Sequence, residues 1–221
     1  MLFRSPRNLF RKGSTGAGVE ERLRQSRNTQ LAQDWSRDGR FVLYNEIAPD
    51  THFDIWVLPV TPEGKPEADA KLYIRTPFNE QEGSFSPETS ISGPRWVAYD
   101  SDESGRYEVY VDSFPEPRGK LRISTDGGTY PKWSPGGREL YYVSRDSKLM
   151  AVSLKMGTDS VEPSAPRELF SLSRVDTGES PYEVAADGRR FLVRAPPQRQ
   201  AAQPLAVIVN WAAALKKGAA E

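Results

Sequence analysis

A short phrase recurs along the chain about every fifty residues. It combines an aromatic residue, a serine and a glycine-containing turn, and an apolar run follows it. The copies are Trp35-Ser36-Arg37-Asp38-Gly39, Phe85-Ser86-Pro87, Trp133-Ser134-Pro135-Gly136-Gly137 and Ala185-Ala186-Asp187-Gly188. The serine, or the alanine that replaces it, stands at 36, 86, 134 and 185, in steps of 50, 48 and 51 residues. A fixed period of this size indicates a repeat architecture, and repeated scaffolds generally present binding surfaces.

Each full repeat unit reads as four short strands. The expected strands are 31–36, 41–44, 53–58 and 71–74, then 82–86, 95–100, 107–111 and 121–123, then 129–134, 138–143, 148–154 and 167–170. Asp38-Gly39 is expected to supply the positive φ angles of a two-residue hairpin. The 18 Pro and 17 Gly suit many short strands joined by tight turns.

The two ends of the chain read as incomplete units. Residues 1–30 fit only the third and fourth strands of a unit, at 8–11 and 21–24. Residues 181–217 fit strands at 181–184, 190–194 and 205–209, followed by a short terminal helix from residue 211. The expected units are 1–30, 31–75, 82–124, 129–171 and 181–217, within one domain.

This pattern predicts an all-β chain that forms a segment of a β-propeller, with about four four-stranded antiparallel blades. The segment is expected to be an open arc or part of a propeller of six or more blades. The two terminal half units either share one blade and close a ring, or remain apart. Open strand edges would invite self-association.

Charge and composition exclude several classes of function. Lys+Arg and Asp+Glu are both 30 among the 221 residues, so no basic excess indicates a nucleic-acid surface. Cysteine is absent, which excludes disulfides and thiolate metal sites. No apolar run approaches the roughly 20 residues that span a bilayer, and residues 1–7 lack the apolar core of a secretory signal. We therefore expect neither nucleic-acid binding nor membrane insertion by this segment.

Two stretches carry a resemblance to a known family. Residues 98–111, Ala-Tyr-Asp-Ser-Asp-Glu-Ser-Gly-Arg-Tyr-Glu-Val-Tyr-Val, and 123–134, Ile-Ser-Thr-Asp-Gly-Gly-Thr-Tyr-Pro-Lys-Trp-Ser, resemble the WD-like propeller repeats of TolB-type proteins. More narrowly, they are similar to the C-terminal propeller of bacterial membrane-linked serine/threonine kinases. The resemblance covers about residues 8–216. It implies a periplasmic or extracytoplasmic sensor or adaptor, although the kinase signature itself does not occur in this sequence.

The residues that carry chemistry form no complete catalytic or metal motif. His52 is the only histidine, and no G-x-S-x-G motif accompanies it. Asp100 to Gly105 begins like a calcium loop, but Val111 stands where that loop requires a glutamate. We therefore expect no catalytic centre, no cofactor and no metal.

The repeated residues are assigned structural roles. The aromatic residues are expected to pack between adjacent blades, and the others to hold the hairpins. This set comprises Trp35, Ser36, Asp38, Gly39, Phe85, Ser86, Trp133, Ser134, Gly137, Asp187 and Gly188.

The loops are the expected contacts for a partner, because binding residues concentrate in loops that a rigid scaffold holds. The segments are 45–52, 87–94, 100–106 and 144–147, and the insertion at 89–93 lengthens one hairpin only. The candidate residues are His52, Ser90, Ile91, Asp102, Glu103 and Arg106.

These observations favour a non-catalytic module that binds a protein or peptide, as a sensor or scaffold. Two alternatives remain open. One is the substrate-gating propeller of a prolyl-oligopeptidase-type peptidase that lacks its hydrolase domain here. The other is a carbohydrate-binding propeller.

Overall fold

The computed structural model describes residues 6–88, 93–157, 159–173 and 179–196, and this part of the chain contains strands but no helix. All strand pairs are antiparallel, and each sheet is built mainly from strands that are consecutive in the sequence. The prediction of an all-β chain is confirmed. No helix that could span a membrane occurs within the described residues.

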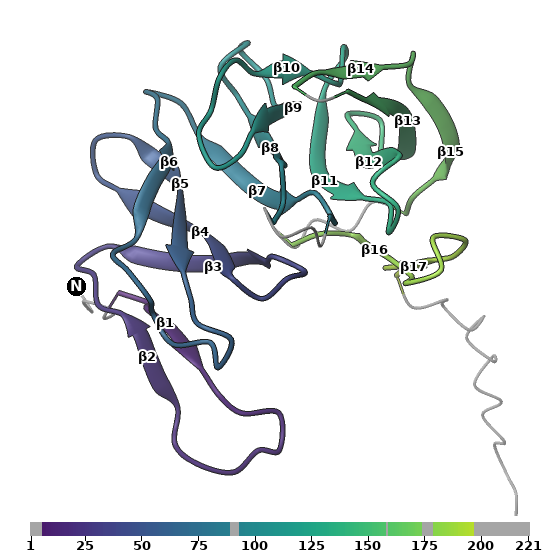
Figure 1. Ribbon diagram of the computed structural model, residues 1–221. Helices are drawn as coiled ribbons and strands as arrows, with labels where there is room; N and C mark the ends of the chain where they lie inside the picture. Colours follow the sequence, from purple (N-terminus) through teal and green to yellow (C-terminus); the bar gives the residue numbers. More distant parts are fainter. Residues whose placement is uncertain (1–5, 89–92, 158, 174–178, 197–221) are drawn as a thin grey trace, which may run out of the picture.

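Three complete blades stand side by side, each a meander of four strands (Figure 1). Blade 1 contains β3 (Thr29–Trp35), β4 (Phe41–Ala48), β5 (His52–Pro59) and β6 (Lys71–Ile74). Blade 2 contains β7 (Glu80–Phe85), β8 (Trp96–Ser101), β9 (Glu108–Ser113) and β10 (Leu121–Arg122). Blade 3 contains β11 (Gly128–Trp133), β12 (Glu139–Ser144), β13 (Lys148–Met156) and β15 (Arg167–Ser171).

Blade 3 also has a short strand that the sequence did not indicate. This strand, β14 (Val161–Pro163), pairs with the end of β13, and β15 pairs with the beginning of β13. β13 is long enough for both because it continues to Met156, two residues beyond the expected end of this strand.

A two-stranded sheet lies at each end of the row. The N-terminal half-blade contains β1 (Leu9–Arg11) and β2 (Glu21–Arg24), and the C-terminal half-blade contains β16 (Tyr182–Val184) and β17 (Phe191–Val193). The two half-blades belong to separate sheets, so the described chain is an open arc. The strand expected at 205–209 and the helix expected from 211 lie outside the described residues.

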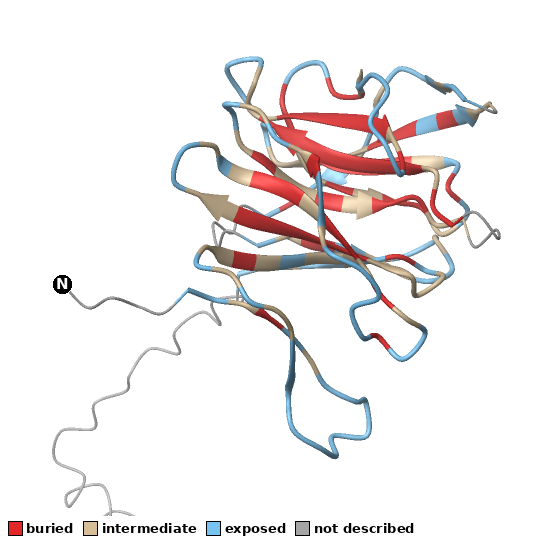
Figure 2. Ribbon diagram, turned by 60° about the vertical axis from the view of Figure 1, so that its left-hand side comes forward, coloured by how far each residue is buried: buried red, intermediate tan, exposed pale blue. Residues whose placement is uncertain are grey.

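The core consists of layers between neighbouring blades, where the buried residues gather (Figure 2). Leu43 and Ile55 on one face of blade 1 pack with Phe85 and Val97 of blade 2. The other face of blade 1 packs against the N-terminal half-blade through Leu9. Since both faces of a middle blade are covered, its second strand is a continuous apolar run instead of an alternating one.

The repeated serine fixes the hairpin between the first and second strands. Ser36 Oγ accepts a hydrogen bond from the backbone N–H of Phe41 at 2.9 Å, and Ser134 Oγ accepts one from Glu139 at 3.0 Å. The turn differs from the expected two-residue type. Gly39 has φ 77°, while Asp38 keeps a negative φ and accepts hydrogen bonds from Ser36 and Arg40. The N–H of Gly39 donates a hydrogen bond to Ser36 O, as in a type I turn followed by a residue in the left-handed conformation.

The recurring aromatic residues are not equally buried. Phe85 and Trp133 are 4% and 7% exposed between blades, as expected, but Trp35 is 46% exposed. Its ring lies against the backbone of Gly64, and its Nε1 donates to Gly39 O at 3.1 Å. The cause is the preceding half-blade, whose described strands are only the outer two of a unit, so no inner strand covers Trp35.

Candidate functional site

The first strands of the three complete blades and of the C-terminal half-blade lie around a common axis (Figure 1). Strands β3, β7, β11 and β16 together line a hollow of about 260 Å³. Its polar and aromatic lining includes Asp34, Trp35, Arg37, Glu82, Lys132 and Glu183. The site is therefore built from four separate units and exists only when the blades are packed together.

Irregularities in the inner strands expose side chains to this hollow. The pairing of β7 with β8 shifts register between Gln81 and Ser84, and Glu82 within this bulge has φ 54°. Tyr130 has φ 57° in the corresponding bulge of β11. A left-handed conformation is costly for residues other than glycine, about 1–3 kcal/mol, and bulges of this kind redirect side chains. Both residues line the axial hollow.

Carboxylates and a lysine share the hollow. Asp34 accepts hydrogen bonds from the backbone N–H groups of Phe85, at 2.7 Å, and Trp35, at 2.8 Å. Burial raises the pKa of Asp34 in spite of these bonds, and it also raises the pKa of Glu82, which Lys132 lowers in part. Lys132 forms an ion pair with Glu183 at 2.7 Å. The lining thus offers charged groups of both signs.

The hairpins between first and second strands surround one end of the hollow. Arg37 of blade 1 donates to the carbonyl of Pro135 in blade 3 at 3.1 Å. A Cβ at Gly137 would lie 3.3 Å from Pro87, and one at Gly188 would lie 3.2 Å from Pro135. The described residues of these hairpins are therefore in contact from one blade to another at the rim of the hollow.

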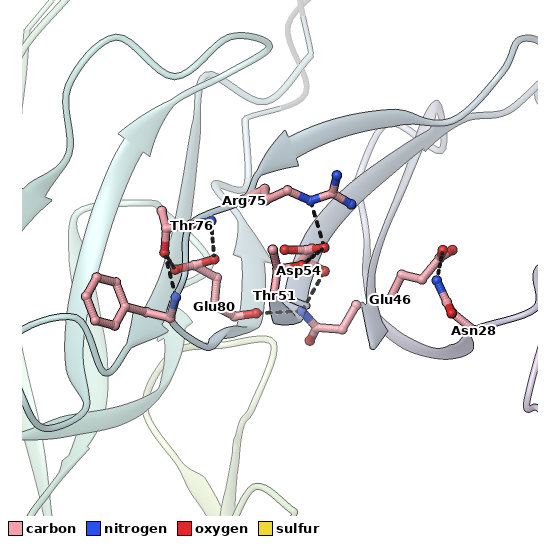
Figure 3. Close-up of polar contacts among 9 residues, drawn as sticks. Asn28, Glu46, Thr51, Asp54, Arg75, Thr76 and Glu80 are labelled. Atoms are coloured by element: carbon pink, nitrogen blue, oxygen red, sulfur yellow. Dashed lines mark hydrogen bonds and ion pairs between the residues drawn. The ribbon is translucent and has the colours of Figure 1, made fainter. Parts of the chain in front are cut away.

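A polar network joins blades 1 and 2 near the opposite end of the strands (Figure 3). Asn45 Nδ2 donates to the carbonyl oxygens of Asp54, at 3.1 Å, and Glu80, at 2.7 Å. The Asp54 carboxylate is fully buried and pairs with Arg75 at 3.0 Å. Glu80 accepts from the N–H of Thr76 at 3.2 Å, and burial raises its pKa. These hydrogen bonds connect residues of adjacent blades, so we assign the network to blade packing, although Asn45 Oδ1 and Asp54 Oδ1 are buried without a hydrogen-bond partner among the described residues.

Asp100, expected both as the last residue of the strand 95–100 and as the first residue of the contact segment 100–106, belongs to β8. It is completely buried in β8, where its Oδ2 accepts a hydrogen bond from the N–H of Tyr130 at 3.0 Å. Burial raises its pKa well above the ordinary value. Asp102 accepts hydrogen bonds from the backbone N–H and the side-chain amide of Asn79, so the two carboxylates have different partners. Among the described residues, no group of three or more acidic or histidine side chains is arranged to hold a metal.

The described loop candidates lie at the other end of the blades from the rim. His52 is exposed with φ 64° at the start of β5, Glu103 pairs with Lys120, and Arg106 pairs with Glu108. Arg106 also lines a second hollow of about 380 Å³, together with Arg145. Ser90 and Ile91 lie outside the described residues.

Sequence reasoning missed the charged residues at the axis. Asp34, Lys132 and Glu183 occupy the position just before the aromatic or apolar residue that ends the first strand. The recurrence of a polar residue at this position of the first strand was the sequence signal that could have indicated them. Several residues assigned purely to the repeat also line the hollow, namely Trp35, Phe85, Ser86, Trp133 and Ser134.

Comparison with solved structures finds proteins of similar fold. A putative TolB from Agrobacterium tumefaciens matches with TM-score 0.51 and 19% identity over 71% of this chain and 55% of its own. TolB from Acinetobacter baumannii matches with TM-score 0.55 and 16% identity over 84% and 42%. A putative 6-phosphogluconolactonase from Bacteroides uniformis matches with TM-score 0.55 and 15% identity over 84% and 56%.

The chain therefore has the β-propeller fold of TolB, as the sequence predicted. It spans about half the length of these solved structures. At 15–19% identity the similarity establishes the fold alone. Comparison with family models and with curated proteins finds no match.

Proposed function

We propose that this propeller segment is a non-catalytic module that binds a peptide segment of a partner protein at the axial hollow. The observation that supports this most strongly is the lining. Strands from four units bring Asp34, Glu82, Lys132 and Glu183 together beside the half-exposed ring of Trp35. Charged groups of both signs beside an aromatic wall suit a peptide, which offers donors, acceptors and apolar side chains together.

The size of the hollow supports a peptide over a small metabolite. Its volume of about 260 Å³ is below the roughly 300–1,000 Å³ of pockets that enclose small ligands. One or two side chains inserted from a docked partner fit this volume better. The described hairpin residues Arg37, Gly137 and Gly188 contact neighbouring hairpins, and such contacts favour docking because they reduce the ordering required on the protein side.

Within this proposal the module serves as a sensor or scaffold. The resemblance to kinase-linked propellers suggests a periplasmic or extracytoplasmic setting in a bacterium. The peptidase-gate alternative predicts a hydrolase segment in the same protein, and the sensor predicts a kinase. The loop residues His52, Asp102, Glu103 and Arg106 are proposed as a secondary contact surface at the other end of the blades.

A peptide display library selected on the intact chain tests the proposal. The best peptides are then titrated against Lys132→Ala and Glu82→Gln. Both changes alter charge at the hollow and leave the core untouched. We expect the dissociation constant to rise about tenfold or more, which corresponds to about 1.4 kcal/mol.

The matched controls are Lys155→Ala and Glu162→Gln. This pair forms an ion pair of similar length, 2.9 Å against 2.7 Å, between exposed side chains of β13 and β14 away from the axis. Unchanged affinity is expected for the controls. If the selected peptides bind the axial and control variants equally well, the hollow is not the binding site.

A further inference from the structure

A third hollow, of about 490 Å³, lies between blades 2 and 3. Its described lining includes Arg95, Trp96, Phe114, Arg118, Gly119 and Asp159. The strands of blade 2 alternate in direction, so the loop between β9 and β10 lies at the same end as the hairpin between β7 and β8. The hollow therefore opens at the end of the blades that carries the rim. None of these residues lines the axial hollow, so the two cavities are separate.

One wall of this hollow comes from the additional strand of blade 3. β13 and β14 form a hairpin, and the N–H of Gly157 donates to the carbonyl of Ser160 across its turn at 2.8 Å. Arg95 of blade 2 donates to the carbonyl of Gly157 at 2.9 Å. Val161 of β14 packs on the cluster that contains Trp96. The hairpin therefore reaches blade 2 and holds one side of the hollow (Figure 1).

The loop that follows β9 forms a second wall, and the side chain of Asp112 holds it in place. Asp112 Oδ1 accepts hydrogen bonds from the N–H groups of Arg118 and Gly119, at 3.0 and 3.2 Å. The N–H of Phe114 also donates to the carbonyl of Arg95 at 2.8 Å. The backbone that presents Arg118 is thus fixed before a ligand binds, which lowers the cost of ordering on binding.

Two arginines give the hollow its binding groups. Arg118 is exposed, and its side chain forms no hydrogen bond or ion pair with the described residues. Arg95 uses its Nη2 toward Gly157 and retains its other donors. Guanidinium groups bind carboxylates and phosphates through two parallel hydrogen bonds. The lining is therefore rich in donors that match an oxyanion.

Aromatic side chains lie beside these arginines. Trp96 and Phe114 line the hollow and are 7% and 9% exposed. Trp96 Nε1 is buried and has no hydrogen-bond partner within the described part of the chain. A buried donor without a partner is costly, and an acceptor on a ligand would relieve this cost. The hollow thus combines an apolar surface with unused donors.

Asp159 is the acidic side chain in the described lining. It lies on the exposed turn of the β13–β14 hairpin, where water and salt screen its charge. The two arginines outnumber it, so the described lining has a net positive charge. This balance favours an anion over a cation as the ligand.

We propose that this hollow binds a small organic anion, in which a carboxylate or phosphate group is attached to an apolar body. The anionic group pairs with Arg95 and Arg118, and the apolar body packs on Trp96 and Phe114. The volume of about 490 Å³ lies within the roughly 300–1,000 Å³ of pockets that enclose small ligands, whereas the axial hollow lies below it. The site is independent of peptide binding at the axis and adds a small-molecule ligand to the proposed function.

NMR titration of the isotope-labelled intact chain tests the site. Phenyl phosphate and phenylacetate are the anionic probes, benzyl alcohol is the neutral probe, and inorganic phosphate lacks the apolar body. The indole N–H signal of Trp96, assigned with Trp96→Phe, and the amide signal of Gly119 are expected to shift with an anionic probe. Benzyl alcohol and inorganic phosphate are expected to bind about tenfold more weakly. The tighter of the two anionic probes identifies the preferred anionic group.

Variants of exposed residues then locate the binding. Arg118→Ala is expected to raise the dissociation constant of the tighter probe about tenfold, because a charge-assisted hydrogen bond is lost. Asp159→Asn is expected to lower it about twofold, because an exposed repulsive charge is removed. The matched control is Arg27→Ala, since Arg27 is also exposed but lies in the linker before blade 1. Unchanged affinity is expected for this control.

Several results would overturn the proposal. One is the absence of a saturable shift at Trp96 and Gly119 with both anionic probes. Others are equal affinity for benzyl alcohol or inorganic phosphate, equal affinity of Arg118→Ala and the control, and weaker binding by Asp159→Asn. The peptide test at the axial hollow uses other variants, so failure of one proposal is distinguishable from failure of the other.

Discussion

Asn45 and Asp100 occupy the same place in successive blades, and each binds the first strand of the blade that follows. Asn45 Nδ2 donates to the carbonyl of Glu80 at 2.7 Å, whereas Asp100 Oδ2 accepts from the N–H of Tyr130 at 3.0 Å. Both side chains are fully buried. The same link between blades is thus made once by a neutral amide and once by a carboxyl group, and the two differ in their dependence on pH.

Asp100→Asn is expected to stabilise the protein at neutral pH. Burial raises the folded-state pKa of Asp100 above its unfolded value, so the folded state binds the proton more tightly. This contribution to the free energy of unfolding therefore becomes less favourable as the pH rises above about 4. The amide retains an oxygen for the N–H of Tyr130. We expect a gain of about 1 kcal/mol at pH 7.5 that shrinks toward pH 4.5, measured by urea unfolding.

Asp146→Asn is expected to change the stability of the protein in the opposite direction. Hydrogen bonds from Ser144 and Lys148 lower the pKa of Asp146, so its contribution is present above the unfolded pKa and is lost as the pH falls. This variant is expected to lose stability at pH 7.5 and to match the original chain at low pH. A change of the same sign for both variants would contradict this account of Asp100.

Trp133→Ala is expected to cost more stability than Trp35→Ala. Trp133 is 7% exposed between blades 2 and 3, and its Nε1 donates to the carbonyl of Ser84 at 3.1 Å. Removing a buried aromatic side chain costs about 3–5 kcal/mol, while the half-exposed Trp35 is expected to contribute about half as much. Urea unfolding of dilute protein measures both. Equal losses would show that Trp35 is buried in solution by something absent from the single chain.

Each hairpin serine is expected to stabilise the protein through the hydrogen bond that its Oγ accepts. Ser134→Ala removes the acceptor for the N–H of Glu139 and is expected to cost about 1 kcal/mol. The converse change is Ala185→Ser, at the unit where alanine stands in the same place. It is expected to slow hydrogen exchange at the amide of Arg190. No change in that amide would show that the fourth hairpin lacks the geometry of the others.

Gly83→Ala is expected to disturb the contact between blades 1 and 2. An added Cβ would lie 2.4 Å from Leu43 Cδ2, so a fully buried side chain would have to move. A loss of about 1–3 kcal/mol is expected, as for overpacked cores. Gly136→Ala is the control, because nothing lies within 4 Å of its Cβ position. It is expected to be neutral or slightly stabilising in thermal unfolding.

Much of the architecture could be predicted because it depends on local patterns. The period near fifty residues, the serine and glycine turns and the apolar second strands together identified the blades and most of their strands. β14 was missed because Val161 to Pro163 has no apolar pattern, and it forms only because β13 continues far enough to pair with it. The terminal strand and helix remain predictions.

The candidate site was less accessible from sequence. Loops were favoured as contacts, yet the axial hollow is lined by first strands whose charged residues, Asp34, Glu82 and Lys132, are distant in the sequence. Asp100 was expected at the boundary between the strand 95–100 and the contact segment 100–106, and the structure shows that it is fully buried in β8.

The sequence by itself determined the repeat, the strand order within each unit and the turn chemistry, because each depends on residues close together in the chain. Tertiary structure decided which aromatic residues are covered, which carboxyl groups are buried and which side chains meet at the axis. Those properties depend on the neighbouring blade. For this reason Trp133 and Trp35, which stand in the same phrase, differ in exposure.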